Sequence, residues 1–226
     1  MLNFDNLIDK HISRELRAKQ EGRYYPSEIG SCMRKVWYSY KDPRPIRVDL
    51  QKIFEVGNIL HDFVAEVLRS EKNPEVELLK SELPFKISMN SFTISGRVDD
   101  LLLVKASGRQ LLVEVKSTSR IDFVTEAKPE NVMQLQLYMH ATGVHNGVLL
   151  YIDKRNLKTK SFTIPFNEGV AAIALNRFNE LHKHLTEEIL PEAEARASRK
   201  EDIGWMCRMC DWRERCFKDT PESELR

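Results

Sequence analysis

Apolar residues recur at helical spacing through the first third of the chain. In residues 4–21 this spacing predicts an amphipathic helix. A second helix is expected after Ser27, a residue type that favours the N-cap, and it should end before Pro43 with Cys32 inside it. Residues 51–71 predict a longer third helix, whose single inward stripe holds Ile53, Gly57, Leu60, His61, Val64 and Leu68.

From about residue 75 the pattern changes to that of strands. Turn residues at 89–91 and 106–109 divide residues 75–118 into three expected antiparallel strands. Pro129 and Gly143 bracket a predicted helix over 130–142, and residues 147–153 form an apolar run typical of a short buried strand. An edge strand over 159–164 and a long helix over 167–199 follow. This order predicts an α/β fold with a mixed sheet flanked by helices.

Acidic residues stand inside the predicted strands, where apolar residues are expected. Glu114 and Lys116 are two apart and share one face of their strand. Asp99 and Asp100 point to opposite faces, and we expect Asp100 to form a salt bridge at the surface or towards a helix. An unpaired carboxylate in an apolar sheet costs several kcal/mol, so Glu114 requires a compensating group.

A divalent cation would compensate Asp99 and Glu114 together. Mg²⁺ and Mn²⁺ prefer carboxylate oxygens, and His61 could add a nitrogen ligand. Such an ion activates water, while Lys116 would stabilise the charge of a pentavalent transition state or orient the attacking water, which is the chemistry of phosphodiester hydrolysis. A second interpretation is a cross-strand lattice of salt bridges between these acids and Arg97, Lys105 and Arg109.

Composition narrows the class of protein. The length of 226 residues suits a single domain over 1–226. The formal net charge of +1 means that any surface for nucleic acid must be local. We expect a cytoplasmic protein that does not contact membranes, because no stretch is apolar enough to cross a bilayer and residues 1–16 lack a signal-peptide pattern.

Four cysteines suggest a second metal centre. Cys207, Cys210 and Cys216 have the spacing C-x2-C-x5-C, and 174 residues separate Cys32 from Cys207. In a reducing compartment this pattern favours metal binding over disulfides. Four thiolates suit either a tetrahedral zinc site or an iron–sulfur cluster, and the spacing alone does not choose between them.

Basic and aromatic residues alternate just after Cys32. Arg34, Lys35 and Trp37, followed by Tyr38 and Tyr40, suit a single DNA strand whose phosphates need cations and whose bases stack on aromatic rings. The same pattern also fits a helix whose aromatic side chains belong to the core and whose cations are solvated.

The motif GRVD, ending at Asp99, is followed after fourteen residues by Glu114-x-Lys116, which resembles the core of the PD-(D/E)XK nuclease superfamily. Residues 57–61, GNILH, resemble the G-x-x-x-H element of its RecB-like branch, and residues 134–138, QLQLY, resemble the Q-x-x-x-Y element. Val98 stands where the motif name has Pro, a departure often found in that branch.

The resemblance implies a restriction-endonuclease-like core over 51–152 and a role for each matched residue. The implied catalytic residues are Asp99, Glu114, Lys116, Gln134 and Tyr138. The implied ligands of Mg²⁺ or Mn²⁺ are His61, Asp99, Glu114 and the backbone carbonyl of Val115. Tyr138 is also expected to contact DNA, together with Arg34, Lys35 and Trp37.

One cysteine before these motifs and three after them resemble the iron–sulfur staple of AddB-type nucleases and of the Cas-four exonucleases associated with CRISPR systems. The resemblance implies a cluster, of the four-iron four-sulfur type, that joins residues 27–42 to residues 200–217 through Cys32, Cys207, Cys210 and Cys216. Zinc remains the alternative.

The resemblance further implies a metal-dependent DNA exonuclease that acts on single-stranded ends. Its role would be CRISPR spacer acquisition, or phage or host recombination and repair, with a CRISPR integrase or a recombination protein as a further partner. The alternative is a non-catalytic module that keeps the fold and binds nucleic acid or a protein partner.

Overall fold

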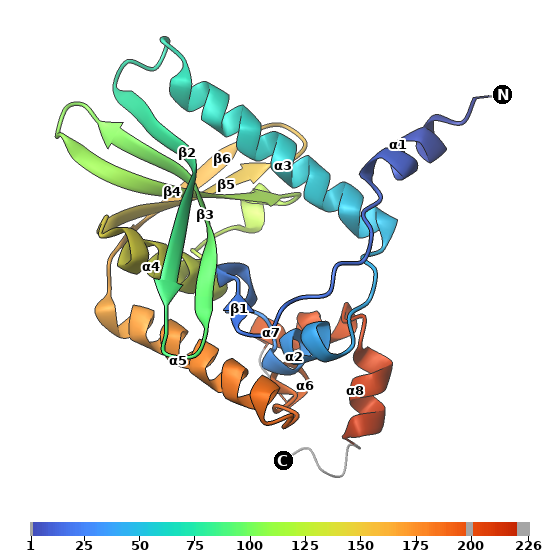
Figure 1. The fold of residues 1–226 in the computed structure, drawn as a ribbon. Helices are drawn as coiled ribbons and strands as arrows, with labels where there is room; N and C mark the ends of the chain where they lie inside the picture. Colours follow the sequence, from blue (N-terminus) through green and yellow to red (C-terminus); the bar gives the residue numbers. More distant parts are fainter. Residues whose placement is uncertain (1, 198–200, 221–226) are drawn as a thin grey trace.

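The computed structural model describes residues 2–197 and 201–220 (Figure 1). The predicted domain over 1–226 and the predicted cysteine segment from residue 200 therefore extend in part outside the described residues. At the centre lies a six-stranded mixed sheet in the order β1-β3-β4-β5-β6, with β2 also paired to β3. The strands are β1 (Arg23–Tyr24), β2 (Val76–Ser88), β3 (Thr93–Val104), β4 (Arg109–Thr118), β5 (Asn146–Asp153) and β6 (Thr159–Pro165).

The sheet confirms the predicted mixed α/β architecture. β2, β3 and β4 are antiparallel neighbours, whereas β5 runs parallel to β4. This change of direction is possible because helix α4 (Pro129–Thr142) crosses over between β4 and β5. Pro129 occupies the first turn of α4, and Gly143 ends it with a φ of 72°, a left-handed conformation that glycine adopts without strain.

Helices cover both faces of the sheet (Figure 1). On one face, Leu60 and Val64 of α3 (Val48–Arg69) pack against Val113 and Val115 of β4. On the other face lies α4, and α5 (Glu168–Thr186) packs against the outer side of α4. No helix in residues 2–197 or 201–220 combines the length and apolarity needed to span a bilayer.

A smaller lobe is built from the start and the end of the described chain (Figure 1). It contains the 3-10 helix η1 (Pro26–Glu28), α2 (Met33–Lys41), α6 (Glu194–Ala197), α7 (Glu201–Arg208) and α8 (Arg213–Asp219). Tyr24, Trp37 and Phe178 belong to the core that joins this lobe to α5. Helix α1 (Phe4–Ile12) has no buried residue and projects from the body.

Four predicted helical features are wrong in detail. The first helix ends at Ile12 instead of residue 21, because residues 13–20 continue outside a helix. The second helix begins at Met33 and not after Ser27, which lies in the 3-10 helix η1, so Cys32 is the N-cap of α2 and not inside it. Glu194, from the far end of the chain, accepts a hydrogen bond from Met33 N at this start. Ile53 is 52% exposed, not part of the inward stripe.

The fourth difference concerns the long helix predicted over 167–199. α5 ends at Thr186, and Glu188 has a φ of 56°, in the left-handed region that breaks a helix. Residues 189–193 then follow outside any helix, whereas residues 198 and 199 of the prediction lie outside the described part of the chain.

β3 and β4 separate at one point, and this separation creates the centre of the molecule. Their pairing extends from Val104↔Arg109 to Asp100↔Val113 and then stops. β3 continues beside β2 as far as the pair Ser88↔Thr93, while β4 continues beside β5. The gap beyond Asp100 therefore opens between two strands that are each held from the other side.

Candidate active site

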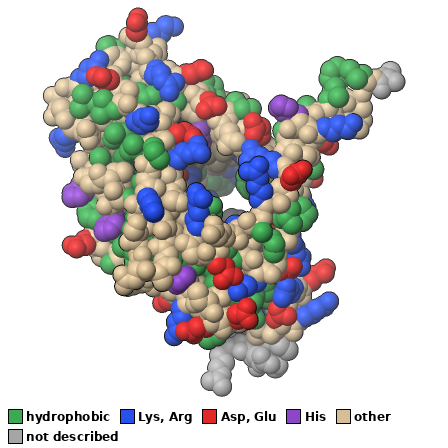
Figure 2. All heavy atoms as spheres, in the orientation of Figure 1, with side chains coloured by type: hydrophobic (Ala, Val, Ile, Leu, Met, Phe, Trp, Pro, Cys, Tyr) green, Lys and Arg blue, Asp and Glu red, His purple; other side chains and the backbone are tan. Residues whose placement is uncertain are grey.

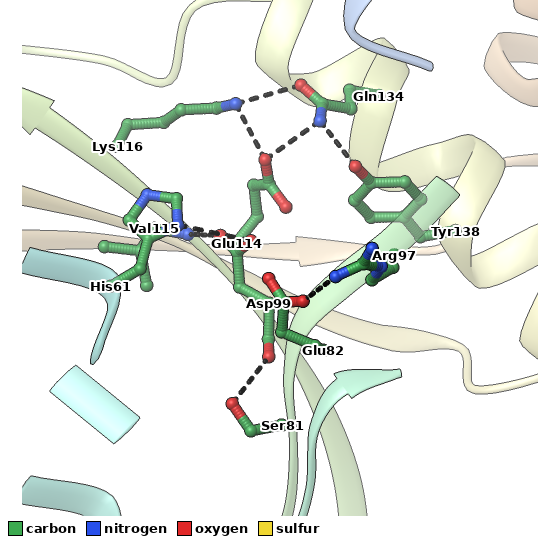
Figure 3. Close-up of polar contacts among 10 residues, drawn as sticks. All are labelled: His61, Ser81, Glu82, Arg97, Asp99, Glu114, Val115, Lys116, Gln134 and Tyr138. Carbon is green, nitrogen blue, oxygen red and sulfur yellow. Dashed lines mark hydrogen bonds and ion pairs between the residues drawn. The ribbon is translucent and has the colours of Figure 1, made fainter. Parts of the chain in front are cut away.

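Asp99 is the first residue of β3 beyond the point of separation. Its Oδ2 accepts a hydrogen bond of 2.7 Å from the backbone N–H of Val115, a group of β4 that lies past the last ladder pair (Figure 3). Its Oδ1 lies 3.5 Å from Nδ1 of His61, which comes from α3. Burial lowers the pKa of His61, but the hydrogen bond and charge of Asp99 outweigh it and leave that pKa raised.

Glu114, Lys116, Gln134 and Tyr138 form one hydrogen-bonded network (Figure 3). Lys116 Nζ donates to Glu114 Oε1 at 2.7 Å and to Gln134 Oε1 at 2.9 Å. Gln134 Nε2 donates to Glu114 Oε1 at 2.9 Å and to the Tyr138 hydroxyl at 2.5 Å. The residues come from β4 and from one face of α4, one turn apart, as the sequence spacing predicted.

Burial controls the ionisation of this network. It raises the pKa of Glu114, and the negative charge of Asp99 raises it further, while Lys116 opposes both effects. The pKa of Lys116 is raised as well, because the charge of Glu114 outweighs the effect of burial. Burial also raises the pKa of Tyr138 well above its ordinary value, so its hydroxyl is neutral. Lys116 is thus a fixed cation beside two carboxyl groups.

The donor set fits a hard divalent cation in its chemistry. Asp99 and Glu114 offer carboxylate oxygens and His61 offers a nitrogen. Glu114 Oε2 is buried and has no hydrogen-bond partner among the described residues, which leaves a buried acceptor available to an ion. Within residues 2–197 and 201–220, no three His, Cys, Asp or Glu side chains are already grouped to hold one ion, so these ligands would have to draw together around it.

The alternative lattice of salt bridges is not formed. Arg97 pairs with Glu82, and neither Asp99 nor Glu114 has Arg97, Lys105 or Arg109 as a partner in the described structure. The salt bridge predicted for Asp100 is also wrong. Asp100 is 1% exposed and forms no ion pair with a described residue, and burial raises its pKa to about 6.

The four cysteines surround a single pocket between α2 and the C-terminal helices. Cys32, Cys207, Cys210 and Cys216 all line it, and none forms a disulfide. The same pocket is lined by four cationic side chains, namely Arg34, Lys35, Arg196 and Arg213. The early cysteine therefore lines the same pocket as the three late ones. Burial raises the pKa of the Cys210 thiol, although the nearby charge of Lys35 opposes this effect.

Arg34 and Trp37, which the sequence predicts to contact DNA, are both buried in this structure. Arg34 is 6% exposed and donates to the carbonyl of Pro191 at 2.6 Å. Trp37 is buried and its Nε1 donates to the carbonyl of His184 at 3.0 Å. Lys35 is half-buried at the cysteine pocket, and Tyr138 is buried against Gln134. The basic and aromatic alternation of α2 therefore belongs mainly to the core.

Two contributions to the cysteine pocket were missed by sequence reasoning. Arg34 lies 3.7 Å from Cys216 Sγ and points a donor at it. Glu194 binds Met33 N, beside Cys32, and is itself held by Arg177 at 2.7 Å. Both contacts join distant parts of the chain: 182 positions separate Arg34 from Cys216, and 161 separate Met33 from Glu194. No local pattern signals such pairs.

The remaining predicted site residues lie together, and their roles stay predictions. His61, Asp99, Glu114 and Lys116 meet at the separation of β3 and β4, with the backbone of Val115 between them (Figure 3). Gln134 and Tyr138 complete the group from α4.

Comparisons with known proteins bear on the family and the fold. The family model described as the PD-(D/E)XK nuclease superfamily matches residues 8–217. No curated protein matches the sequence. Among solved structures, the protein described as SSO0001 is 19% identical, with a TM-score of 0.57, over 98% of this chain and 95% of that chain.

Two exonuclease structures are also similar. An alkaline exonuclease from Laribacter hongkongensis is 17% identical, with a TM-score of 0.52, over 75% of this chain and 90% of its own. A phage-related exonuclease from Haemophilus somnus is 13% identical, with a TM-score of 0.51, over 83% of this chain and 98% of its own. At these identities the similarity concerns the fold.

Tyr138→Phe should destabilise the protein by about 1–2 kcal/mol, because the buried amide of Gln134 loses an acceptor while the ring keeps its contact with Phe85. The free energy of unfolding in urea measures the effect. In a Gln134→Met background the same substitution should cost almost nothing, since no amide remains to be satisfied. Equal costs in both backgrounds would contradict the network.

Proposed function

Because the chain belongs to the PD-(D/E)XK nuclease superfamily, we propose that it is a metal-dependent DNA exonuclease that hydrolyses phosphodiester bonds from single-stranded ends. The observation that carries this proposal is the group at the separated strands. There Glu114 is buried beside Asp99 and Lys116, and one of its oxygens has no hydrogen-bond partner among the described residues. A fold without catalysis gains nothing from burying these charges together.

The residues that would hold the divalent cation are Asp99, Glu114 and His61, with the backbone carbonyl of Val115. Once bound, the cation supplies a Lewis acid that polarises the phosphate and lowers the pKa of a water molecule. The hydrogen bond from Val115 N fixes the carboxylate of Asp99 at the opening. The pair formed by Asp99 and His61 orients the imidazole.

Lys116 acts on the substrate phosphate. Its ammonium group has three N–H donors, and two of them bind Glu114 and Gln134. Its side chain is 26% exposed, so the third donor can reach a phosphate oxygen or the attacking water. A fixed cation at this position stabilises the charge that develops on the transition state.

Gln134 and Tyr138 act through their neighbours. Gln134 uses its amide oxygen for Lys116 and its amide nitrogen for Glu114 and Tyr138, so its own polar atoms are already engaged. We assign both residues to positioning: Tyr138 holds the amide of Gln134, and Gln134 holds Lys116 and Glu114 in one geometry.

DNA as the substrate has two further supports. Figure 2 shows a hollow in one face of the molecule with Lys and Arg side chains around its rim, which suits a polyanion. The alkaline exonuclease from Laribacter hongkongensis, LHK-Exo, is also described in a structure in complex with dAMP. Processing of DNA ends in CRISPR spacer acquisition, or in phage or host recombination and repair, is the role that we propose for this activity, with an integrase or recombination protein as partner.

The cysteine pocket is proposed to hold an iron–sulfur cluster that joins the two ends of the described chain. Cys32, Cys207, Cys210 and Cys216 line one pocket, so four thiolates could serve one centre. Zinc sites with four cysteines usually have two C-x2-C-like pairs. One remote cysteine with three clustered ones departs from that plan, which supports a cluster over zinc.

Cleavage of end-labelled DNA tests the nuclease proposal. With Mn²⁺ the native chain should shorten a linear single strand from its end, act more slowly on blunt duplex and leave a circular single strand intact. Glu114→Gln should reduce the rate at least about 100-fold, because the site loses an ionised ligand and the partner of Lys116. Glu77→Gln, at an exposed carboxylate of β2, is the matched control and should keep the native rate.

If the native chain shows no metal-dependent cleavage of any of these DNAs, the alternative of a non-catalytic binding module takes the place of the exonuclease. Cleavage of the circular strand would replace the exonuclease with an endonuclease.

Anaerobic purification tests the cluster. The native protein should be brown and contain iron and sulfide, and Cys210→Ser should lose the visible absorbance, because this pocket residue supplies one of the four thiolates. Replacing an exposed residue of the same region, as in Met209→Ser, should leave the colour unchanged. A colourless native protein with one zinc per chain would overturn the assignment.

A further inference from the structure

The loop between β4 and α4, residues 119–128, is held firmly to the sheet. It contains the 3-10 turn η2 (Ile121–Phe123), whose first residue is 2% exposed and donates its backbone N–H to Asp153 Oδ2 at 3.3 Å. Lys160 Nζ donates to the carbonyl of Asp122 at 3.3 Å and to that of Val124 at 2.9 Å. The loop therefore has buried anchors on both sides of residue 123.

Phe123 points outward from this anchored turn. Its side chain is 78% exposed, the largest exposure of any large apolar side chain in the described residues. The guanidinium carbon of Arg120 lies 5.7 Å from the centre of its ring. An aromatic face beside a cation on a fixed backbone is the combination that single-stranded nucleic acid uses for base stacking and phosphate contact.

The neighbouring hairpin between β5 and β6 adds positive charge. Its turn carries Lys154, Arg155 and Lys158. Arg155 pairs with Asp153, whereas Arg120, Lys154 and Lys158 form no ion pair with a described residue. The backbone N–H of Lys154 donates to the carbonyl of Thr118 at 2.8 Å, which ties this turn to the end of β4. Lys154 and Lys158 thus lie on the turn that is tied to the end of β4, where the loop with Arg120 begins.

Both ends of the loop are attached close to Lys116. The loop begins after Thr118, two residues past Lys116 on the same strand, a distance of about 7 Å along a strand. It ends at Lys128, whose backbone N–H donates to the hydroxyl of Tyr151 at 3.0 Å. Tyr151 is the register partner of Lys116 in β5. Nucleotides adjoining a phosphate at Lys116 are therefore within reach of the loop.

We propose that Phe123 and Arg120, with Lys154 and Lys158, form a binding platform for unpaired nucleotides next to the catalytic group. Phe123 stacks on a base, and the cations contact the phosphates on either side. The inference rests on the proposed nuclease function and deepens it, because a stacking platform requires a base whose face is exposed. Single-stranded DNA offers such bases and an intact duplex does not.

Binding of a fluorescent single-stranded oligonucleotide, without a catalytic metal, tests the platform directly. Phe123→Ala should raise the dissociation constant about tenfold, which is the effect of losing one stacked base. Phe123→Trp should restore the native affinity. Phe4→Ala is the matched control, an exposed phenylalanine on α1 with 69% exposure, and should bind as the native protein does. Lys158→Ser should lower the slope of log affinity against log salt by about 0.7.

Native affinity in Phe123→Ala, or an equal loss in Phe4→Ala, would overturn the platform. Circular dichroism of each variant confirms folding, and Phe123 is exposed enough that its removal leaves the core intact.

Hydrolysis of a small phosphodiester, thymidine 5′-p-nitrophenyl phosphate, separates this inference from the function on which it rests. This ester is too short to reach Phe123, so Phe123→Ala should hydrolyse it at the native rate while its KM for the oligonucleotide rises. If the native chain cleaves neither substrate, the nuclease proposal fails, and the binding measurement still decides the platform. If the native chain and Phe123→Ala cleave the oligonucleotide alike, the platform alone fails.

Discussion

The ionised groups buried between β3 and β4 are the constraint on which the rest of the active region depends. Glu114 is 3% exposed and lies beside a second carboxylate, Asp99, so burial and like charge both oppose its ionisation. Lys116 and the amide of Gln134 both donate to Glu114 Oε1, whereas Glu114 Oε2 has no hydrogen-bond partner among the described residues. We propose that a divalent cation at this place would supply the missing positive charge and make the unfavourable cluster catalytic.

The fold brings these groups together by parting two strands. Because the β3–β4 ladder stops at Asp100↔Val113, the carboxylate of Asp99 takes the N–H of Val115 that a further ladder pair would have used. α3 and α4 lie on opposite faces, yet His61 and Gln134 both reach this opening. The cysteine pocket lies apart from this opening, between α2 and the segments that follow α5.

Local periodicity predicted the sheet and α4, because alternation, turn residues and the Pro129 and Gly143 boundaries act over a few residues. The motif residues were also placed together correctly, since strand parity and the helical turn fix which side chains share a face. Features that depend on distant partners were not predictable. Arg34 has the sequence setting of a DNA contact, but Pro191 and its neighbours cover it, and Glu194 decides where α2 begins. Asp100 is buried at 1% exposure and forms no ion pair with a described residue, unlike the salt bridge that its charge suggested.

Calorimetric titration of the DNA-free protein with Mn²⁺ tests the central claim most directly, because it measures the cation without requiring turnover. The account predicts a saturable site in the native chain that is lost in both Asp99→Asn and Glu114→Gln and is retained in Glu77→Gln. An absence of Mn²⁺ binding by the native chain, or binding that survives in both carboxylate variants, would contradict it.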